Sequence, residues 1–330
     1  MIKCPLTLSS LLALLLLSPA SQAIQIVTAT STNYNTSDNI GSSVTNWSTG
    51  WGTGNTNDGW NYTGLVTVSD GYGSGIYLGD GWVLTAGHVG VGTFDISGNT
   101  YNSTGLSFTD FTNSLTGTSN ADLTLFQIST TSLTGNPLSL LSLTIASNAP
   151  TAFSATQAGS QVVMIGYGGL GEKSWGVNTV TSTGLTIPVS GYNFDSVDFL
   201  TAYGVTSYTN RVGRTRITNS ITNNAQVYPG DSGGADFINV SGRWELAGVN
   251  EAVGTGTNNL GDSYLVQLSA YDAQITAIMA SVPEPSALVL LGGGLIVLLM
   301  MRRKFLPLEI LPGNSADPRA IPISRDDPHH

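Results

Sequence analysis

Cysteine is almost absent from this chain of 330 residues, and basic side chains are scarce. The only cysteine is Cys4, close to the start, so no disulfide can stabilise the rest of the chain. Lys and Arg together number 11 against 21 Asp and Glu, which makes the formal net charge -10. A chain with so few basic residues has no face on which to hold nucleic acid phosphates.

Charge of either sign is also low. Charged residues make up only 10% of the chain, whereas 41% of the residues are hydrophobic. Disordered chains combine high net charge with too few apolar residues to offset the entropy of ordering, so this composition excludes a largely disordered protein. The chain can bury a core, and burial rather than cross-linking must stabilise it.

Histidine is the third scarce residue type. Between Ile24 and Ser281 the chain has one histidine, His88, and no cysteine, while His329 and His330 stand at the extreme end. Too few nitrogen and sulfur ligands remain for a metalloenzyme. We therefore expect no metal and no cofactor at a functional site, although calcium bound by surface carboxylates stays open.

The first 23 residues have the composition of a secretory signal. Lys3 precedes an apolar run from Leu11 to Leu17, and a small-residue site follows at Ser21-Gln22-Ala23. We expect cleavage before Ile24, and therefore an exported protein.

A second apolar segment lies near the other end. Val282-Pro283-Glu284-Pro285 precedes an apolar stretch from Ala287 to Met301, and Arg302-Arg303-Lys304 follows it. The stretch is shorter than the roughly 20 residues that a stable membrane-spanning helix prefers, and the glycines at 292–294 weaken it further. The basic cluster favours the cytoplasmic side. We expect at least transient membrane contact through residues 286–301.

The order of these parts over residues 282–304 resembles the C-terminal sorting signal of PEP-CTERM proteins. The resemblance implies an exosortase-like sorting enzyme as a partner. It also implies the cell envelope, surface or extracellular matrix of a Gram-negative bacterium as the destination. A plain membrane anchor is the alternative. The signal usually ends the chain, whereas here a polar, Pro-rich tail follows at residues 305–330, for which no packed structure is expected.

Short apolar, β-branched runs recur between these two ends, separated by Gly, Asn, Asp and Ser. The runs are Gly64–Val68, Gly75–Leu78, Trp82–Leu84, Leu123–Ile128, Val162–Tyr167, Asn178–Thr183, Trp244–Asn250 and Tyr264–Leu268. Such spacing is typical of an antiparallel sandwich or barrel, so we predict an all-β fold. One helix is expected at Ser269–Ser281, where Ile275, Ile278 and Met279 fall on one face and Ser269 is the N-cap.

Composition divides the stretch between the signal and the Pro-Glu-Pro sequence into two parts. Residues 24–63 are rich in Ser, Thr, Asn and Gly, and we expect them to form an irregular arm. Residues 64–281 contain the predicted strands and the predicted helix, and we expect them to form the functional domain.

His88 is the only residue of this domain that can act as an imidazole base at neutral pH. It follows the apolar run Trp82–Leu84 and the small residues Ala86 and Gly87. A lone histidine after a strand is more often structural than catalytic. Its role therefore depends on motifs elsewhere in the chain.

Ser232 stands in a glycine-rich sequence, Pro229-Gly230-Asp231-Ser232-Gly233-Gly234. Glycines permit unusual backbone angles and close approach of a substrate, although the same residues also make ordinary turns. The sequence satisfies the Gly-x-Ser-x-Gly pattern of α/β-hydrolases as well. Those enzymes place their acid and histidine after the serine, whereas here only His329 and His330 follow Ser232. Chain order therefore excludes the hydrolase reading.

The order that remains is histidine, acid, serine. Asp122 directly precedes the apolar run Leu123–Phe126, where a carboxylate can be held under an imidazole. Asp95 and Asp110 are weaker candidates because their surroundings are more polar and turn-like. The alternative for Asp122 is a solvated turn residue.

Thr85-Ala86-Gly87-His88, Asp122-Leu123-Thr124-Leu125 and Gly230-Asp231-Ser232-Gly233-Gly234 together resemble the three catalytic motifs of the chymotrypsin/trypsin-like serine endopeptidases. The resemblance extends from about Gly64 to Ser281. It implies two six-stranded antiparallel β-barrels with the active site between them, and we place the division between the barrels near residues 140–155.

The resemblance also implies roles for single residues. Ser232 attacks the carbonyl of a polypeptide substrate, His88 accepts and returns the proton, and Asp122 orients the imidazole. The backbone N–H groups of Gly230 and Ser232 form the oxyanion hole.

Asp231 receives a separate role from the resemblance, which is to accept an ion pair that locks the oxyanion hole in its active shape. In many relatives the partner is a newly cut α-amino group. Ile24 is a suitable new N-terminus, although 64 residues separate it from His88, which is more than the family usually has. A second cut or an internal basic partner is equally open. The internal candidates are Lys173, Arg211, Arg214, Arg216 and Arg243.

Gln226 lies six residues before Ser232, at the base of the specificity pocket that the resemblance implies. Cleavage after Lys or Arg calls for an aspartate at this position. A neutral amide supplies no counter-charge, so we expect no strong preference for basic residues. The pocket wall, around Val249 to Gly254, also departs from the family pattern, and Glu251 there either alters selectivity or is solvated.

Two functions of different classes remain. The first is an exported serine endopeptidase. The second is a catalytically silent surface or matrix binding protein on the same scaffold, which the Ser/Thr/Asn-rich arm and the sorting segment favour. Three motifs in working context favour the enzyme, because a binding role gives no reason to keep them together.

Overall fold

The structure is a computed structural model of the whole chain. It describes residues 24–27, 32–33, 35–118, 120–154, 157–168, 171–188, 193–202, 207–209, 215–217, 224–254 and 262–282. The chain divides into two compact units, residues 1–281 and 282–330, and the fold below is that of the first unit. The predicted signal, the apolar stretch 286–301 and the tail 305–330 lie outside the described residues.

The first unit is mostly β, as predicted. Its strands are β1 (Gln25–Val27), β2 (Thr32–Asn33), β3 (Thr63–Val68), β4 (Gly71–Gly79), β5 (Trp82–Thr85), β6 (Thr93–Ile96), β7 (Asn99–Tyr101), β8 (Ser103–Phe108), β9 (Thr124–Ile128), β10 (Gln161–Gly166), β11 (Ser174–Pro188), β12 (Asp195–Ala202), β13 (Ser207–Thr209), β14 (Thr215–Ile217), β15 (Asn224–Gln226), β16 (Ala235–Val240), β17 (Arg243–Val253) and β18 (Asp262–Gln267). The helical elements are η2 (Ile40–Ser42), α1 (Gly59–Tyr62), η4 (Leu268–Ala270) and α2 (Asp272–Ser281). All eight predicted runs lie wholly or largely within strands.

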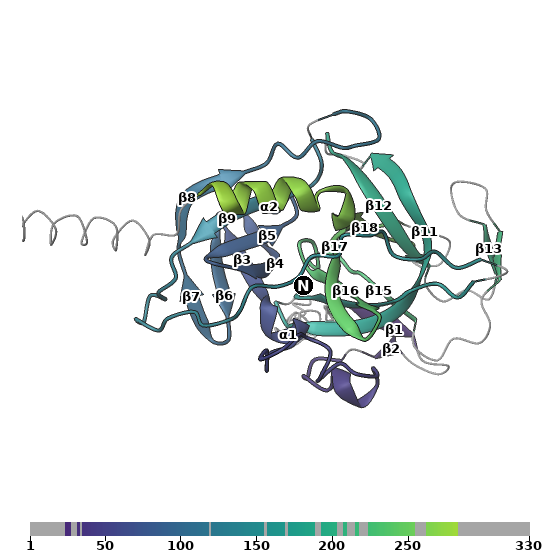
Figure 1. Cartoon of the computed structure of the whole chain (residues 1–330), viewed down its shortest axis with the longest axis horizontal. Coiled ribbons are helices and arrows are strands. Elements are labelled where there is room, and N and C mark those ends of the chain that lie inside the picture. Colours follow the sequence, from purple (N-terminus) through teal and green to yellow (C-terminus); the bar gives the residue numbers. More distant parts are fainter. Residues whose placement is uncertain are drawn as a thin grey trace, which may run out of the picture. The chain divides into compact units, whose positions relative to one another are not determined.

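The second half of the unit forms a closed antiparallel barrel, in the order β10-β11-β12-β18-β17-β16 (Figure 1). Apolar side chains from all of its strands fill the interior, among them Met164, Val180, Phe199, Ile238 and Leu265. This barrel confirms the second of the two predicted six-stranded barrels.

The first half of the unit does not form the other predicted six-stranded barrel. It is a seven-stranded sheet in the order β7-β6-β3-β4-β5-β9-β8. Its two outer strands, β7 and β8, follow each other in the chain with only Asn102 between them. One bent stretch of chain therefore supplies both outer strands. The sheet curls upon itself, but it is not a closed six-stranded barrel. Its core includes Tyr62, Tyr77, Phe94 and Phe126.

The two β bodies are joined by the connection between Ile128 and Gln161, in which the described residues, all but 155–156, form no strand. The predicted division near residues 140–155 falls in this connection. Part of this connection lies against the barrel. Ala146 donates its N–H to the carbonyl of Leu246 at 2.8 Å, and Leu246 donates to Thr144 at 2.9 Å.

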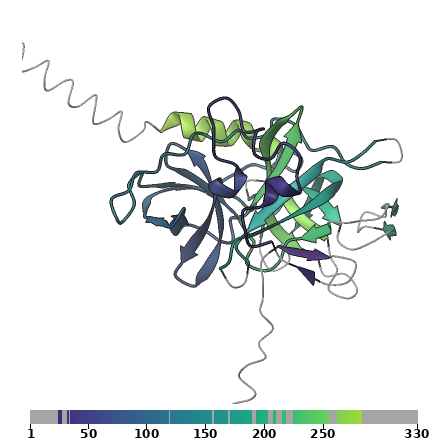
Figure 2. The same cartoon turned by 90° about the horizontal axis from the view of Figure 1, so that it is seen from below.

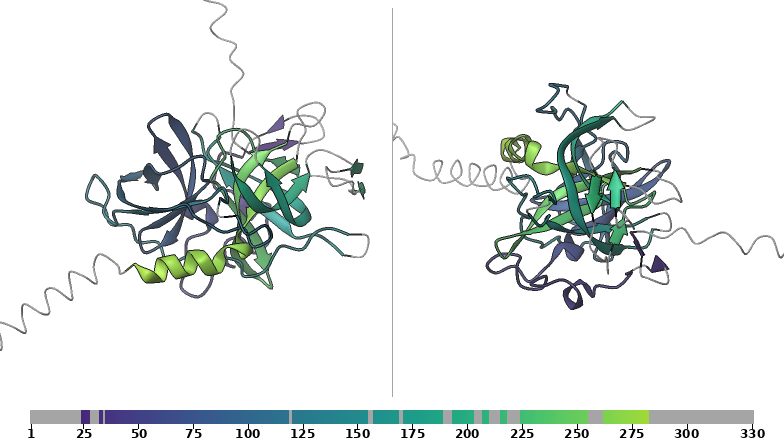
Figure 3. Two further views of the ribbon diagram at one scale, coloured as in Figure 1. Left: turned by 90° about the horizontal axis from the view of Figure 1, so that it is seen from above. Right: turned by 90° about the vertical axis from the view of Figure 1, so that its right-hand side faces the viewer.

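The predicted C-terminal helix is confirmed as α2, although it starts at Asp272, and Ser269 lies in the preceding η4 turn. The helix packs on the first body, as Figure 3 shows from above. The Gln274 side chain accepts the N–H of Thr112 at 2.9 Å and donates to its carbonyl at 3.0 Å. Ile275 is fully buried, as the predicted apolar face requires.

The arm runs over the barrel before it enters the first body at β3 (Figure 2). Trp244 donates from Nε1 to the Asn46 carbonyl at 3.0 Å, and its ring lies 4.9 Å from that of the buried Trp47. Lys173 donates from Nζ to the carbonyls of Trp60 and Thr63, at 2.7 and 2.8 Å. Although irregular, the arm is therefore an integral part of the packed unit.

Candidate active site

His88 and Asp122 form a close pair beside the end of β5. The Nδ1 atom of His88 lies 2.6 Å from Oδ2 of Asp122, and the backbone N–H of His88 donates to Oδ1 at 2.8 Å. Asp122 is fully buried, and its own N–H donates to Oγ of Ser196 at 2.9 Å. Both carboxylate oxygens are thus used to hold one histidine, so the orientation of the ring is set by two contacts. The solvated-turn alternative for Asp122 is wrong.

The electrostatic surroundings favour the charged form of His88. Burial by itself lowers the pKa of His88, because it disfavours charge. The hydrogen bond to Asp122 and the charges of Asp122 and Glu251 act in the opposite direction, and the net result is a pKa above the ordinary value. An imidazolium at this position is therefore stabilised.

Ser232 lies in the turn between β15 and β16 and lines the same cavity as His88. The cavity has a volume of about 190 Å³, and the strand β17 supplies Asn250, Glu251, Ala252 and Val253 to its wall. The Ser232 carbonyl accepts the N–H of Ser74 on β4 at 2.7 Å, which ties the turn to the first body.

This close approach depends on a glycine in β4. A Cβ atom on Gly73 would lie 2.9 Å from the Ser232 carbonyl and 2.6 Å from Val89. A side chain here would push the serine turn away from the first body.

The backbone around Ser232 alternates in its hydrogen bonding. Asp231 donates its N–H to the carbonyl of Tyr228 at 2.9 Å, and Gly233 donates to that of Asn250 at 2.8 Å. Within the described part of the chain, the N–H groups of Gly230 and Ser232 have no protein acceptor. Gly230 has a φ of 99°, in the region that favours glycine. Two donors are thus left available on either side of Asp231.

Asp231 is fully buried beneath this turn. Its carboxylate accepts the N–H of Tyr228 at 2.7 Å, that of Gly168 at 2.9 Å and also that of Ile24. Burial raises the pKa of Asp231 to about 7, although the three hydrogen bonds lower it in part. Ile24 is itself fully buried in the barrel core. The residue at the predicted cleavage site therefore lies directly against the buried acid.

Comparison with known families bears on this arrangement. The sequence model of the trypsin-like peptidase domain matches residues 73–249, which is more than half of the chain. The chain belongs to the trypsin-like peptidase family. It is accordingly a serine-type peptidase, and its barrel and curled sheet are those of a trypsin-like fold. No curated protein matches the chain in sequence.

A second family model concerns the other end of this trypsin-like peptidase. The PEP-CTERM protein-sorting motif matches residues 281–304, which confirms the resemblance stated above. The motif implies export and sorting to the cell envelope of a Gram-negative bacterium. Among the described residues, no helix combines the length and apolar character needed to cross a membrane.

Solved structures resemble the chain at low identity. An inactive form of Rv3671c from M. tuberculosis H37Rv is 16% identical, with a TM-score of 0.44, over 68% of this chain and 90% of that chain. Neuropsin, a serine protease expressed in the limbic system of mouse brain, is 14% identical, with a TM-score of 0.43, over 67% of this chain and 95% of that chain.

The other predicted site residues fall in different places. Gln226 ends β15, pairs with Gln25 of β1 and directly precedes Val227 of the cavity wall. Asp95 lies on β6, where it accepts a hydrogen bond from Thr100, and Asp110 is exposed. Neither of these two acids is at the site.

Three further polar residues lie behind Asp122. Ser196 and Asp198 belong to β12, a strand that sequence reasoning missed, and both are fully buried. The available signal was an acid inside an apolar run, with Val197 before it and Phe199 after it. Glu251 is only 3% exposed, so of its two alternatives the solvated one is wrong.

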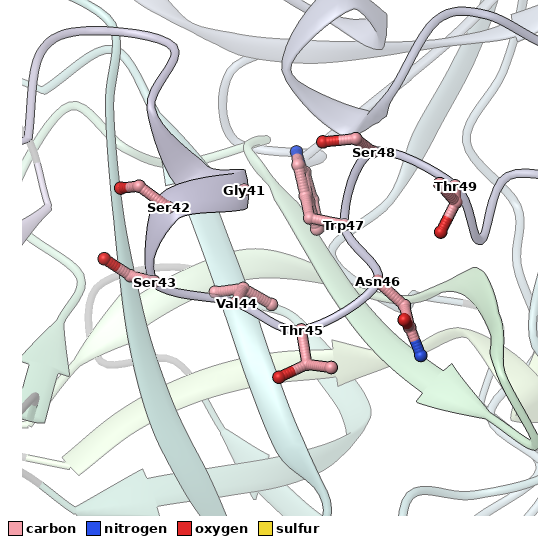
Figure 4. Close-up of a pocket in the computed structure, with 9 residues that line it drawn as sticks. All are labelled: Gly41, Ser42, Ser43, Val44, Thr45, Asn46, Trp47, Ser48 and Thr49. Atoms are coloured by element: carbon pink, nitrogen blue, oxygen red, sulfur yellow. The ribbon is translucent and has the colours of Figure 1, made fainter.

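A larger pocket of about 370 Å³ lies in the arm, away from these residues. A single stretch, Gly41–Thr49, supplies its whole lining, and Figure 4 shows Ser and Thr hydroxyls with one Trp ring. It contains no titratable side chain, so it offers no chemistry of its own.

Proposed function

We propose that this trypsin-like peptidase is an exported serine endopeptidase that cleaves peptide bonds through His88, Asp122 and Ser232 and an acyl-enzyme intermediate. The observation that carries the proposal is that His88, which two hydrogen bonds join to Asp122, lines the same cavity as Ser232. His88 is the only histidine between Ile24 and Ser281, so the imidazole base of this domain can be no other residue.

The carboxylate of Asp122 fixes the tautomer of the base. With the Nδ1 proton directed at Asp122, the Nε2 atom of His88 carries a lone pair and can accept the proton of Ser232. The Ser232 oxygen then attacks the substrate carbonyl, and His88 returns the proton to the leaving amine. The raised pKa of His88 supports the imidazolium that forms between these two steps.

The oxyanion that forms on the attacked carbonyl needs donors that are already in place. The N–H groups of Gly230 and Ser232 supply them, since both lack a protein acceptor within the described part of the chain. Removing one such donor typically costs about 2.7 to 4 kcal/mol of barrier.

Asp231 holds these donors in shape, and its partner follows from the position of Ile24. The N–H of Ile24 already donates to the Asp231 carboxylate. Cleavage before Ile24 would turn this amide into an ammonium group at the same place and so neutralise the buried acid. Two internal cations are committed elsewhere, since Lys173 donates to Trp60 and Thr63 and Arg243 donates to Thr144.

The cavity beside Ser232 favours substrates without a basic side chain at the cleavage site. Its walls include Val227, Ala252 and Val253. Glu251 lies in the same wall, but burial raises its pKa to about 8, so it carries little negative charge at neutral pH. Gln226, at the base by family position, is neutral. No aspartate stands there to pair with Lys or Arg.

The sorting segment directs where the enzyme acts. We propose that an exosortase-like enzyme processes residues 282–304 after export, with at least transient membrane contact through residues 286–301. The peptidase would then cleave polypeptides in the envelope, at the surface or in the extracellular matrix.

Labelling with a fluorophosphonate probe tests the proposal. The full chain is expressed with its leader in a Gram-negative host, its N-terminus is read by mass spectrometry, and the labelled residue is mapped. We expect labelling at Ser232 in the wild type, loss of labelling in S232A and H88A, and normal labelling in D110N. The D110N variant is a matched control, because its acid is exposed.

Two negative results have different meanings. No labelling of protein that begins at Ile24 would overturn the endopeptidase and support the catalytically silent scaffold. Labelling that appears only after the leader is removed would support activation by that cut.

A further inference from the structure

A buried hydrogen-bond chain leads from Asp122 to Glu251. Asp122 donates its backbone N–H to Oγ of Ser196 at 2.9 Å, and Ser196 donates its hydroxyl proton to Oε1 of Glu251 at 2.7 Å. The mechanism above uses neither Ser196 nor Glu251. Ser196 nevertheless bonds to Asp122, which orients His88, and Glu251 bonds to Ser196.

The backbone places Glu251 in this position by a β-bulge. Along β17 and β18, Asn250 is opposite Leu265 and Ala252 is opposite Tyr264, so Glu251 is the extra residue between them. A bulge breaks the alternation of a strand and re-aims one side chain. Here it turns an acid into the protein, at the wall of the cavity that holds His88 and Ser232.

Nothing in the described part of the chain compensates a negative charge on the acid next to Glu251. Asp198 is fully buried, and within the described part of the chain no N–H or O–H group of another residue type donates to its oxygens. Its carboxyl hydrogen-bonds to that of Glu251, which requires a proton between the two acids. Burial, together with the neighbouring acids, raises the pKa of Asp198 well above its ordinary value. Two hydrogen-bonded carboxyls cannot both be ionised at low cost, and the bond raises the pKa of Asp198 while it lowers that of Glu251, so Asp198 is the acid that holds the shared proton.

Other titratable groups also face this pair. Burial, and after it the charge of Asp122, raises the pKa of Glu251 to about 8, while the charge of His88 lowers it in part. Tyr271 from the turn before α2 and Asp195 at the start of β12 face Asp198. Tyr271 accepts the N–H of Val197 at 2.8 Å, so its hydroxyl is held in place. His88 is the only one of these groups that can carry a positive charge.

We propose that Glu251 is a positioning residue of the proposed triad. Glu251 acts on Asp122 through the hydroxyl of Ser196, and it acts on His88 through its own charge. The inference rests on the proposed function of that triad. While Glu251 holds a proton, Asp122 is the negative charge that acts on His88 among the described groups that shift its pKa. When Glu251 loses the proton, a second negative charge favours the imidazolium form, which cannot accept the proton of Ser232.

Titration of His88 by NMR tests this charge effect without any need for catalysis. The His88 ring signals are identified by their loss in H88A, and the pKa of His88 is measured in the wild type, E251Q and D198N. In E251Q the amide keeps an acceptor for Ser196 but removes the charge, so we expect the pKa of His88 to fall by about 0.5 unit or more. D198N replaces a neutral acid by a neutral amide that can still donate a hydrogen bond to Glu251, so it should leave the titration of His88 unchanged.

The labelling rate provides a second readout. The acidic limb of its pH profile should move to lower pH in E251Q and stay in place in D198N. E251A removes the acceptor for Ser196, so its labelling rate should fall about tenfold, and E251Q should restore the rate at the optimum.

An unchanged pKa of His88 in E251Q, or an equal shift in D198N, would overturn the role of Glu251 even if Ser232 is labelled normally. Absence of labelling in the wild type would instead overturn the proposed function, while the titration still decides the charge effect. Should E251Q fail to fold, the wild type suffices. Because Glu251 titrates in the same pH range as His88, the His88 titration curve of the wild type must be broader than a single-site curve. A single-site curve would contradict the proposal.

Discussion

At the scale of single residues, the site depends on what Asp122 does with its two oxygens. One oxygen holds the ring of His88 and the other holds its backbone, and both contacts are removed from solvent. A buried charge is costly unless hydrogen bonds satisfy it, and both oxygens of this acid are hydrogen-bonded to His88. The position and tautomer of the proposed base are therefore set by one carboxylate.

Replacing Asp122 by Asn tests this dependence. An amide of the same shape can present its N–H group to Nδ1, which places the imidazole proton on Nε2 and removes the base. We expect the rate of acylation to fall by about 10⁴ with little change in thermal stability. Fluorophosphonate labelling kinetics and a melting curve measure both effects, with D110N as the control. A D122N protein that labels at the wild-type rate would contradict the role of Asp122.

Position 233 requires a glycine for two reasons. Its φ is +83°, and a Cβ atom would lie 2.1 Å from the carbonyl oxygen of Ser74 and 2.2 Å from Oγ1 of Thr85. Gly98 has a similar φ of +74° with nothing within 4 Å of such an atom. The two positions therefore separate backbone strain from steric overlap.

We expect G98A to cost about 1 kcal/mol of the free energy of unfolding, because only the backbone is strained. G233A should cost several times more and should abolish labelling of Ser232, because the turn must move away from β4. Urea unfolding measures the first effect and probe labelling the second. Equal unfolding costs for the two variants would show that overlap at Gly233 is relieved elsewhere.

At the scale of elements, the N-terminal strand β1 connects the predicted cleavage site to the candidate active site. Gln25 of β1 is opposite Gln226 of β15, and Ile24 just before it reaches Asp231. β1 and β15 pair antiparallel over three residues each, so the strand holds Ile24 at a defined position. The chain end that the proposed cleavage would create is therefore already docked beside Asp231.

One extra residue before Ile24 tests the activating role of this end. The added residue moves the ammonium group away from Asp231, while the strand pairing of β1 is kept. We expect labelling of Ser232 to fall by at least about tenfold, with an unchanged far-ultraviolet circular dichroism spectrum. Protein that begins at Ile24 is the reference. Full activity of the extended form would show that another cation serves Asp231.

Strands of regular apolar pattern could be predicted from the sequence, and those with special chemistry could not. β10, with Val162, Val163 and Ile165, is continuous and apolar. β12 carries the buried polar residues Ser196 and Asp198. In a single sequence, Ser and Asp indicate a turn or a loop rather than a strand. The hairpin of β6 and β7 is too short and polar to stand out. The same buried polar residues that hid β12 are the ones that extend the site.

At the scale of the whole molecule, basic residues are scarce, and in the described part of the chain several buried acids form no ion pair with Lys or Arg. Asp198, Asp236 and Glu251 are at most 3% exposed, and burial raises the pKa of each above its ordinary value. Such acids keep their protons in the folded state at a pH at which the unfolded chain releases them. The folded state then binds more protons, so its stability falls as the pH rises.

The expected result is a protein that is most stable in mild acid. The contribution of these acids is fully present below a pH of about 4, where the unfolded chain is protonated as well, and it is lost as the pH rises through the raised values. Between pH 5 and pH 8.5 we expect the free energy of unfolding to fall by at least about 2 kcal/mol. Urea unfolding at both pH values measures this, and E251Q should reduce the difference. Equal stability at the two pH values would show that these acids are ionised in the folded state.

The sequence by itself determined the class of the fold, the order of histidine, acid and serine, and the family, because these depend on local composition and on spacing along the chain. Only the tertiary structure decided which acid meets His88, how Ile24 reaches Asp231, and that Glu251 is buried beside Asp198. Each of these is a contact between residues distant in sequence, set by strand register and by one bulge. No pattern within a single stretch of chain records such a contact.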